Sequence, residues 1–489
     1  MIRTSQSKRA GKSRSRKSRA GKRSDKSRRG KRGRTAPTSA SYHRQLGQAI
    51  ARHLPHQGLP LLGDDRRVRW MPRMLVMQAV FMAWAMANTI KDRFDQAREA
   101  LVGIHPTRRR PGQTPEGFTA ALANHGPELL GFLSGHWRKQ VREVAGAYWE
   151  VLGWIVFSAD GTKIDCPRTL ANEQELGVTG KNNGGPQMLL TCLFHVGAGL
   201  LWNWTTGGIA GNSERGQLLS MIASLPANAL LLADAGFTGY DLLKALLDQE
   251  TDFLIRVGAN VNLLRELGYD VYEDQDTVYL WPLSKQTATG RPLQAMPKSL
   301  EKVSVPLALR IIRLRDAKGK PVCLLTNVSK ERMSDSDAAR LYKMRWGVEV
   351  VWRDLKQTMG HHKVLGRKPG TATAELDWAM AGLWLMQLMS AERMLASKKP
   401  PQQHSPASTL RVLRRAMTGR GRRGSTLGRE LAGAVKDDYA RKKSKQARHR
   451  VRKRGQKPPG EPKTRMATDV EIRLAQRLRD HPPPQSIAA

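Results

Sequence analysis

Short apolar runs separated by polar and turn-forming residues dominate the middle of the chain. Five of them lie between residues 154 and 257, namely WIVFSA, MLLTCLFHV, LLWNW, ALLLA and DFLIRV. Runs of this length, bounded by Gly and Asn and mixed with helical segments at 213–225 and 240–250, are typical of strands in an α/β sheet. The pattern predicts a mixed α/β sheet flanked by helices.

The segments on either side of this sheet follow other patterns. Residues 36–147 have apolar positions at helical spacing and predict a helical domain, which either recognises DNA ends or serves only for packing. Residues 258–332 contain the runs TVYLWPL and PVCLLTNV and predict a β-rich insertion. Helices follow, the first over about 335–359, so the core is expected to comprise 148–257 together with 333–395.

Both ends of the chain are strongly basic. Residues 1–35 are almost wholly Lys, Arg, Ser and Gly. They bury too little apolar surface to fold, so a disordered basic arm is expected. Such an arm serves either solubility or sequence-independent contact with phosphates. From 396 to 489 Pro, Arg and Lys dominate, which predicts a basic, partly disordered C-terminal region with a few short helices.

The charge of the whole chain indicates a polyanionic partner. Lys and Arg total 83 and Asp and Glu total 42, a formal net charge of +41, and such a chain repels itself unless it works against a polyanion. Nucleic acid is favoured over a membrane because Gln78 and Asn88 interrupt the most apolar stretch. No apolar segment follows the basic N-terminus, and the three cysteines form no CxxC pair. A cytoplasmic protein associated with DNA is therefore expected.

Two aspartates directly follow predicted strands. Asp160 comes after WIVFSA, and Asp234 comes after ALLLA. In an α/β sheet the carboxyl ends of strands form the crevice where ligands gather, so both side chains can point to one place. A single Asp after a strand is usually a turn or cap residue. The pair therefore suggests a site without deciding it.

A third acidic residue, Glu349, lies on the helix predicted over 335–359. At about 100° per residue, one face of this helix gathers Glu349 with four residues that can contact phosphate: Tyr342, Arg345, Arg353 and Lys356. Alone, this face suits solvated ion pairs between residues four apart. With the two strand-end aspartates, however, Glu349 completes the hard oxygen ligands that a pair of Mg²⁺ ions requires.

These motifs resemble the IS4-type DDE transposases. The helix reproduces the spacing of that family's Y-R-E-K signature, with two, three and six residues between Tyr342, Arg345, Glu349 and Lys356. The sequences SADGT and ADAGF, which contain the two aspartates, are similar to the family's first and second acidic motifs.

Further features agree with this resemblance, which covers about residues 150–395. The tripeptide Ser213-Glu214-Arg215 is similar to another short pattern of the family, and a β-rich insertion before the glutamate is also found there. One departure is Ala235, where many relatives carry Arg. It puts one phosphate contact in doubt.

The resemblance implies an RNase H-like core and a DNA transposase that excises and inserts an insertion sequence by cut-and-paste transposition. Asp160, Asp234 and Glu349 are the implied catalytic residues, and they are also the implied ligands of two Mg²⁺ or Mn²⁺ ions per site. The residues expected to contact DNA are those on the helix face, Tyr342, Arg345, Arg353 and Lys356. The implied partners are double-stranded DNA, both as terminal inverted repeats and as target, and a second copy of the chain in a homodimer on DNA, with no membrane.

Several alternatives stay open at this point. Two other functions agree with the same sequence features. One is a non-catalytic basic nucleic-acid-binding protein derived from a transposase, and the other is an RNase H-like nuclease that cuts without joining. Tyr342 as a covalent nucleophile would leave the two aspartates without a task. Trp281 is either the aromatic residue that holds a flipped base in relatives or, more commonly for a Trp, a packing residue.

Overall fold

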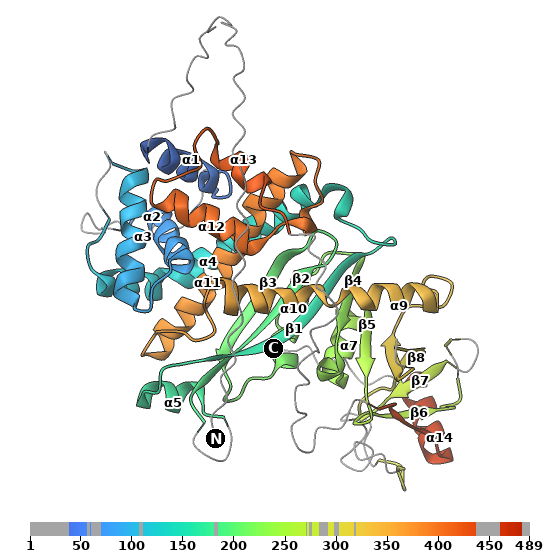
Figure 1. The fold of residues 1–489 in the computed structure, drawn as a ribbon. Coiled ribbons are helices and arrows are strands. Elements are labelled where there is room, and N and C mark those ends of the chain that lie inside the picture. Colours follow the sequence, from blue (N-terminus) through green and yellow to red (C-terminus); the bar gives the residue numbers. More distant parts are fainter. Residues whose placement is uncertain are drawn as a thin grey trace, which may run out of the picture. The chain divides into compact units, whose positions relative to one another are not determined.

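The central feature of the computed structural model is a sheet whose described strands run in the order β10-β6-β7-β8-β9-β5-β4-β1-β2-β3 (Figure 1). The structure describes residues 39–55, 59, 70–106, 111–179, 184–269, 271–272, 276–282, 292–297, 303–316, 319–436 and 460–481. The predicted arm at 1–35 and part of the predicted C-terminal region lie outside these residues.

Five strands of this sheet correspond to the five apolar runs. They are β1 (Ile155–Asp165), β2 (Gln187–His195), β3 (Leu200–Gly208), β4 (Ala229–Ala233) and β5 (Asp252–Val257). β2 is antiparallel to both β1 and β3, whereas β4 is parallel to β1 and β5 is parallel to β4. β4 is buried throughout, which explains why its sequence is continuously apolar instead of alternating. The predicted mixed α/β sheet is confirmed, and antiparallel strands in it are continued by parallel ones.

The strands that follow β5 extend the same sheet. They are β6 (Asn262–Arg265), β7 (Thr277–Leu280), β8 (Leu307–Arg315) and β9 (Pro321–Thr326), and β9 is antiparallel to β5. β10 (Lys463–Met466) adds an edge strand beside β6, and α14 (Asp469–Asp480) supplies Leu474 and Leu478 to an apolar cluster with Tyr279 and Trp281. The strands expected between 258 and 332 are therefore present. The domain boundaries themselves stay a prediction.

Helices from both halves of the sequence pack around one long buried helix, α11 (Pro369–Leu395). Its neighbours include β3 and two helices of the N-terminal segment, α2 (Pro72–Trp84) and α4 (Pro115–Ala145). The indole of Trp84 donates a hydrogen bond to the backbone oxygen of Gly382 at 2.9 Å, a close approach that a larger residue at 382 would hinder. α1 (Ser39–Ala51) and α3 (Ile90–Ile104) complete this helical layer.

The apolar stretch that raised the question of a membrane is the helix α2. Ten of its residues are buried in the protein core. Within the ranges described above, no helix is both long enough and apolar enough to cross a membrane.

The helix predicted over 335–359 is divided. α9 (Asp335–Met344) begins at Ser334, whose side chain accepts a hydrogen bond from the backbone N–H of Asp337. At 345–346 the backbone keeps helical angles, but the hydrogen bonds join residues three apart, and α10 (Gly347–Arg353) then leads into the π-helical turn η4 (Asp354–Thr358). The helix predicted over 335–359 is therefore present, but it is not regular α-helix throughout, because the 3.6-residue period records which positions are buried and not where the turns tighten or widen.

Candidate active site

The two aspartates of the predicted site lie on neighbouring strands of the sheet. Asp234 directly follows β4, as predicted, but Asp160 lies within β1, which continues to Asp165. The prediction that Asp160 follows a strand was therefore wrong, because the polar residues after it continue the strand. Ser158 and Leu232 are paired in register, and each aspartate lies two residues beyond its member of that pair. Asp234 then caps the short turn η3 (Ala235–Phe237) by accepting a hydrogen bond from the N–H of Gly236 at 2.8 Å. The sheet therefore brings the two carboxylates to the same level on neighbouring interior strands.

Asp160 is held in an environment that opposes its charge. Burial raises the pKa of this carboxyl above its ordinary value, and the negative charge of Asp234 adds to the effect. A hydrogen bond from the indole N–H of Trp352, 2.9 Å from Oδ2, and the cation of Arg345 act in the opposite direction. Trp352 lies on α10, so the helix that carries Glu349 contacts the first aspartate directly.

Arg345 connects the third acidic residue to this pair. Its guanidinium donates a hydrogen bond to Oε1 of Glu349 at 3.1 Å and interacts electrostatically with both aspartates. Burial lowers the pKa of Arg345, but its anionic neighbours outweigh burial and raise it overall. Arg345 is only 9% exposed, so its charge is directed at the carboxylates and not at solvent.

The carboxylate oxygens of Asp160, Asp234 and Glu349 suit hard divalent cations, but these side chains are not arranged as a closed metal site. Throughout the part of the chain that the structure describes, no three His, Cys, Asp or Glu side chains converge closely enough to hold a metal ion. Glu349 is instead engaged by Arg345. The sequence prediction that Asp160, Asp234 and Glu349 share ions therefore stays a prediction.

Comparison with known proteins identifies the segment that contains these residues. A model of the family described as "Transposase DDE domain" matches residues 155–385. Residues 155–385 are a transposase DDE domain. The chain is also 27% identical over 245 residues to the transposase InsG of insertion sequence element IS4 from Escherichia coli (strain K12). The IS4-type DDE resemblance read from the sequence is thereby confirmed.

The extent of these similarities is limited. The alignment with InsG covers 48% of this chain and spans about half, 52%, of InsG itself. A cryo-EM structure of a piggyBac transposase synaptic complex with hairpin DNA overlaps with 78% of each chain at 10% identity, with a TM-score of 0.38. That overlap is too loose to assign either a fold or a function.

The DDE domain contains a further acidic side chain at this site, Glu214, to which sequence reasoning gave no role. A Cβ atom placed on Gly161 would lie 2.6 Å from Oε1 of Glu214, and one placed on Gly236 would lie 3.7 Å from its Oε2. The carboxylate therefore lies near the backbone segments that follow the two aspartates, and at Gly161 it takes up space that a Cβ atom would fill. Burial raises the pKa of Glu214, and the charges of Asp160 and Asp234 raise it further.

Neighbouring side chains fix the position of Glu214. α6 (Glu214–Leu219) is capped by Ser213, and Arg215 donates a hydrogen bond to the backbone oxygen of Thr238 at 3.1 Å. Gln217 accepts a hydrogen bond from Thr191 of β2 at 2.7 Å. Within the described ranges no hydrogen bond or ion pair of the Glu214 carboxylate itself is present. The signal available in the sequence was the tripeptide Ser213-Glu214-Arg215, but it carried no indication of distance.

The residues expected to contact DNA differ in how they are held. Lys356 donates hydrogen bonds to Oγ1 of Thr162 at 2.6 Å and to the backbone oxygen of Lys163 at 2.9 Å, which fastens η4 to β1. Arg353 is exposed and lies 3.7 Å from Asp354. Tyr342 is half-buried, with the guanidinium of Arg345 5.9 Å from its ring centroid. A role in DNA contact remains a prediction for all of them.

Trp281 is a packing residue in this structure. It is 4% exposed within the cluster between β7 and α14, and its indole N–H donates a hydrogen bond to the backbone oxygen of Ser304. The more common of the two interpretations of Trp281 agrees with this environment.

Proposed function

We propose that the chain is a DNA transposase, which cleaves the ends of a mobile element and joins them to target DNA by cut-and-paste transposition. The observation that carries this proposal is the meeting of Asp160, within β1, and Asp234, directly after the adjacent parallel strand β4, with Glu349 linked to both through Arg345. The transposase DDE domain match and the similarity to InsG support it.

Asp160, Asp234 and Glu349 would hold a pair of Mg²⁺ or Mn²⁺ ions. The fit rests on the chemistry of the donors, which are all carboxylates, and on the position of Asp160 and Asp234 on neighbouring parallel strands. When bound, such a pair activates a water or a DNA 3′-hydroxyl and stabilises the leaving oxygen of the phosphodiester.

The protein's own side chains prepare this site for metal and DNA. Trp352 orients the carboxylate of Asp160 through its indole N–H. Arg345 neutralises part of the carboxylate charge. When Glu349 turns away from Arg345 toward the aspartates, the guanidinium of Arg345 becomes free to hold a backbone phosphate. Glu214 adds a fourth carboxylate beside the aspartates and contributes to the negative field that attracts cations.

A cleavage and strand-transfer assay tests this proposal. Purified protein is incubated with Mg²⁺ or Mn²⁺ and duplexes that carry the inverted repeats flanking the coding region. Asp160→Asn, Asp234→Asn and Glu349→Gln should abolish cleavage while DNA binding is kept. The matched control is Asp248→Asn, which removes an exposed carboxylate of the same domain that pairs only with Lys244 on its own helix, and this variant should cleave normally.

The alternatives give other results in the same assay. Cleavage without joining indicates an RNase H-like nuclease, and binding without cleavage under any metal condition indicates a non-catalytic derivative. Near-normal cutting by one of the three acidic variants would remove that residue from the proposed ligand set.

The same proposal includes a homodimer that assembles on paired DNA ends in the cytoplasm. Light scattering of the protein–DNA complex should therefore give two chains per assembly.

A further inference from the structure

A pocket rich in arginine lies outside the DDE domain, between α12 (Pro406–Met417) and α13 (Leu427–Ala432). The segment 406–436, which contains both helices, has eight basic residues and a single acidic one, Glu430. The pocket has a volume of about 300 Å³, and its lining includes four guanidinium groups and two hydroxyl groups: Arg411, Arg415, Arg422, Arg429, Ser408 and Ser425. We call it the arginine pocket.

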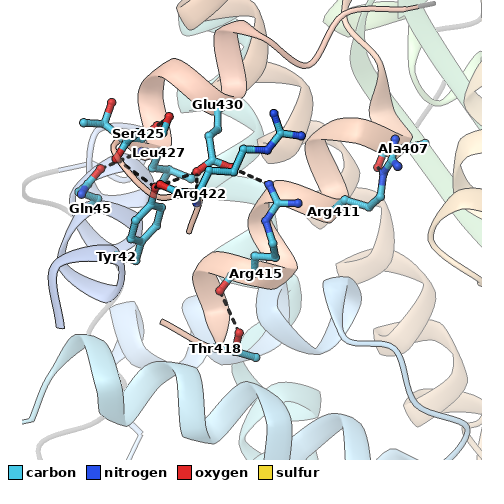
Figure 2. A network of polar contacts seen from close by, with 11 residues as sticks. Tyr42, Gln45, Ala407, Arg411, Arg415, Thr418, Arg422, Ser425, Leu427 and Glu430 are labelled. Atoms are coloured by element: carbon cyan, nitrogen blue, oxygen red, sulfur yellow. Dashed lines mark hydrogen bonds and ion pairs between the residues drawn. The ribbon is translucent and has the colours of Figure 1, made fainter. Parts of the chain in front are cut away.

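The one carboxylate in the arginine pocket already accepts three hydrogen bonds from the protein. Glu430 accepts hydrogen bonds from the hydroxyl of Tyr42 at 2.7 Å, from the backbone N–H of Arg422 at 2.9 Å and from the guanidinium of Arg415 at 2.5 Å (Figure 2). Its side chain is 3% exposed. Glu430 therefore balances the charge of Arg415 and is almost wholly buried.

The other three arginines of the pocket keep an unbalanced positive charge. Within the described residues, no acidic side chain pairs with Arg411, Arg422 or Arg429, and the recorded side-chain contacts of Arg411 are with Ser408 and the backbone of Ala407 on its own helix. All three are exposed. Three guanidinium groups without counterions around one hollow repel each other, and an anion that enters the hollow relieves this repulsion.

The pocket is held in place by contacts from a distant part of the chain. Tyr42 lies on α1, and Gln45 of the same helix accepts a hydrogen bond from the backbone N–H of Leu427 at 2.8 Å, where α13 begins. α12 also packs against η4, the last turn of the helix segment that carries Glu349. The backbone that carries the arginines is therefore held in place before any ligand arrives, which reduces the entropy lost on binding.

We propose that the arginine pocket binds a phosphate group of the DNA backbone and so anchors DNA beside the catalytic domain. This inference rests on the proposed function, because it takes DNA as the partner. Planar guanidinium groups hold phosphate oxygens through paired hydrogen bonds. Arg420 and Arg423, which are exposed on the loop between the two helices, extend the positive surface beyond one phosphate, and this favours a polyanion over a small anion. Contacts of this kind fix position and carry no base sequence.

The test compares two double variants that remove equal charge. Arg422→Ala with Arg429→Ala alters the pocket but leaves Arg415 and Glu430 intact, and Arg473→Ala with Arg477→Ala alters exposed positions on α14. Binding of a fluorescent duplex is measured by anisotropy over a series of salt concentrations. The slope of log K against log salt should become shallower by about 2 in the pocket variant, because each phosphate contact contributes about 0.9. The α14 variant should keep the slope of the unmodified protein.

A second variant guards against loss of folding as the cause. Ser425→Asp adds a negative charge to the pocket and removes no arginine, and it should weaken duplex binding while the thermal midpoint of unfolding stays unchanged. Equal changes in both double variants, or an unchanged slope in the pocket variant, would overturn the inference. If inorganic phosphate stabilises the unmodified protein but not the pocket variant while the DNA slope is unchanged, the pocket takes a free anion and the inference is wrong. Absence of DNA binding by the unmodified protein would refute the proposed function instead.

Discussion

Replacement of Gly161 by alanine should disturb the acidic site with little effect on stability. The added Cβ would lie 2.5 Å from Cγ of Glu214 and 2.6 Å from its Cδ and Oε1. Since ordinary contact begins at 3.4 Å, the carboxylate must retreat by roughly 1 Å, because packed atoms do not interpenetrate. The backbone of Gly161 does not adopt a positive φ, so alanine itself is accommodated there.

The energetic terms of this substitution nearly cancel. Alanine restricts the unfolded chain and should stabilise the fold by about 0.4–1 kcal/mol. Turning the Glu214 side chain out of its rotamer costs about 0.5–1.5 kcal/mol. The free energy of unfolding, measured by urea denaturation, should therefore change by less than about 1 kcal/mol. DNA cleavage should fall by up to about 100-fold, since a 1 Å misplacement at a site has effects of that size.

A double-mutant cycle separates this explanation from a general disturbance of β1. In the Glu214→Ala background there is no carboxylate to displace, so Gly161→Ala should reduce cleavage no further. Gly131→Ala is the control, because its added Cβ meets no atom within 4 Å on α4, and it should leave cleavage unchanged. The reasoning fails if Gly161→Ala lowers cleavage equally in both backgrounds, or if it lowers cleavage in neither.

Three further predictions follow from individual contacts. Trp352→Phe removes the N–H that binds Asp160 and should lower the free energy of unfolding by about 1.5–3 kcal/mol; an effect of the same size in the Asp160→Ala background would show that the hydrogen bond is not its cause. Lys356→Ala should make the salt dependence of DNA binding shallower by about 1, and an unchanged slope would leave Lys356 only its contacts to β1. Burial lowers the pKa of His361 to about 4, with Arg93 and Arg414 adding to the effect, so the unfolded chain takes up this proton first and stability falls as pH drops below about 6.5 toward 4. Between pH 7 and pH 5 the unmodified protein should lose about 2 kcal/mol more than His361→Gln in urea denaturation, and equal losses would contradict the assignment.

The parts of the fold that sequence patterns predicted are those encoded locally. The apolar runs before Asp160 and Asp234 are buried strand segments, and their parallel pairing places the two carboxylates together. The connection of Lys356 to Thr162 depends on residues that are remote in sequence. The change of the helix at 345–346 consists of local backbone hydrogen bonds that leave no mark on the burial pattern. The apolar stripe of that helix remains buried through the division, so periodicity alone could not reveal it.

Glu214 illustrates the same limit at the site itself. It begins a helix of six residues, which is too short for a periodic pattern to indicate a buried face. Its place between Asp160 and Asp234 depends on the two glycines that follow those residues, at positions 161 and 236, and on the anchoring of α6 by Arg215 and Gln217. The arginine pocket likewise forms only when α1 meets α13.

The central claim is that Asp160, Asp234 and Glu349 bind the same divalent cations, and metal-directed cleavage of the polypeptide tests it most directly. Fe²⁺ replaces Mg²⁺ in the DNA-bound protein, and ascorbate with peroxide generates hydroxyl radicals that cut the backbone beside the bound ion. Fragments ending near residues 160, 234 and 349 that vanish when excess Mg²⁺ is added are the result that we expect. Fragments near 160 and 234 with none near 349, or no Mg²⁺-sensitive fragments at all, would contradict the claim.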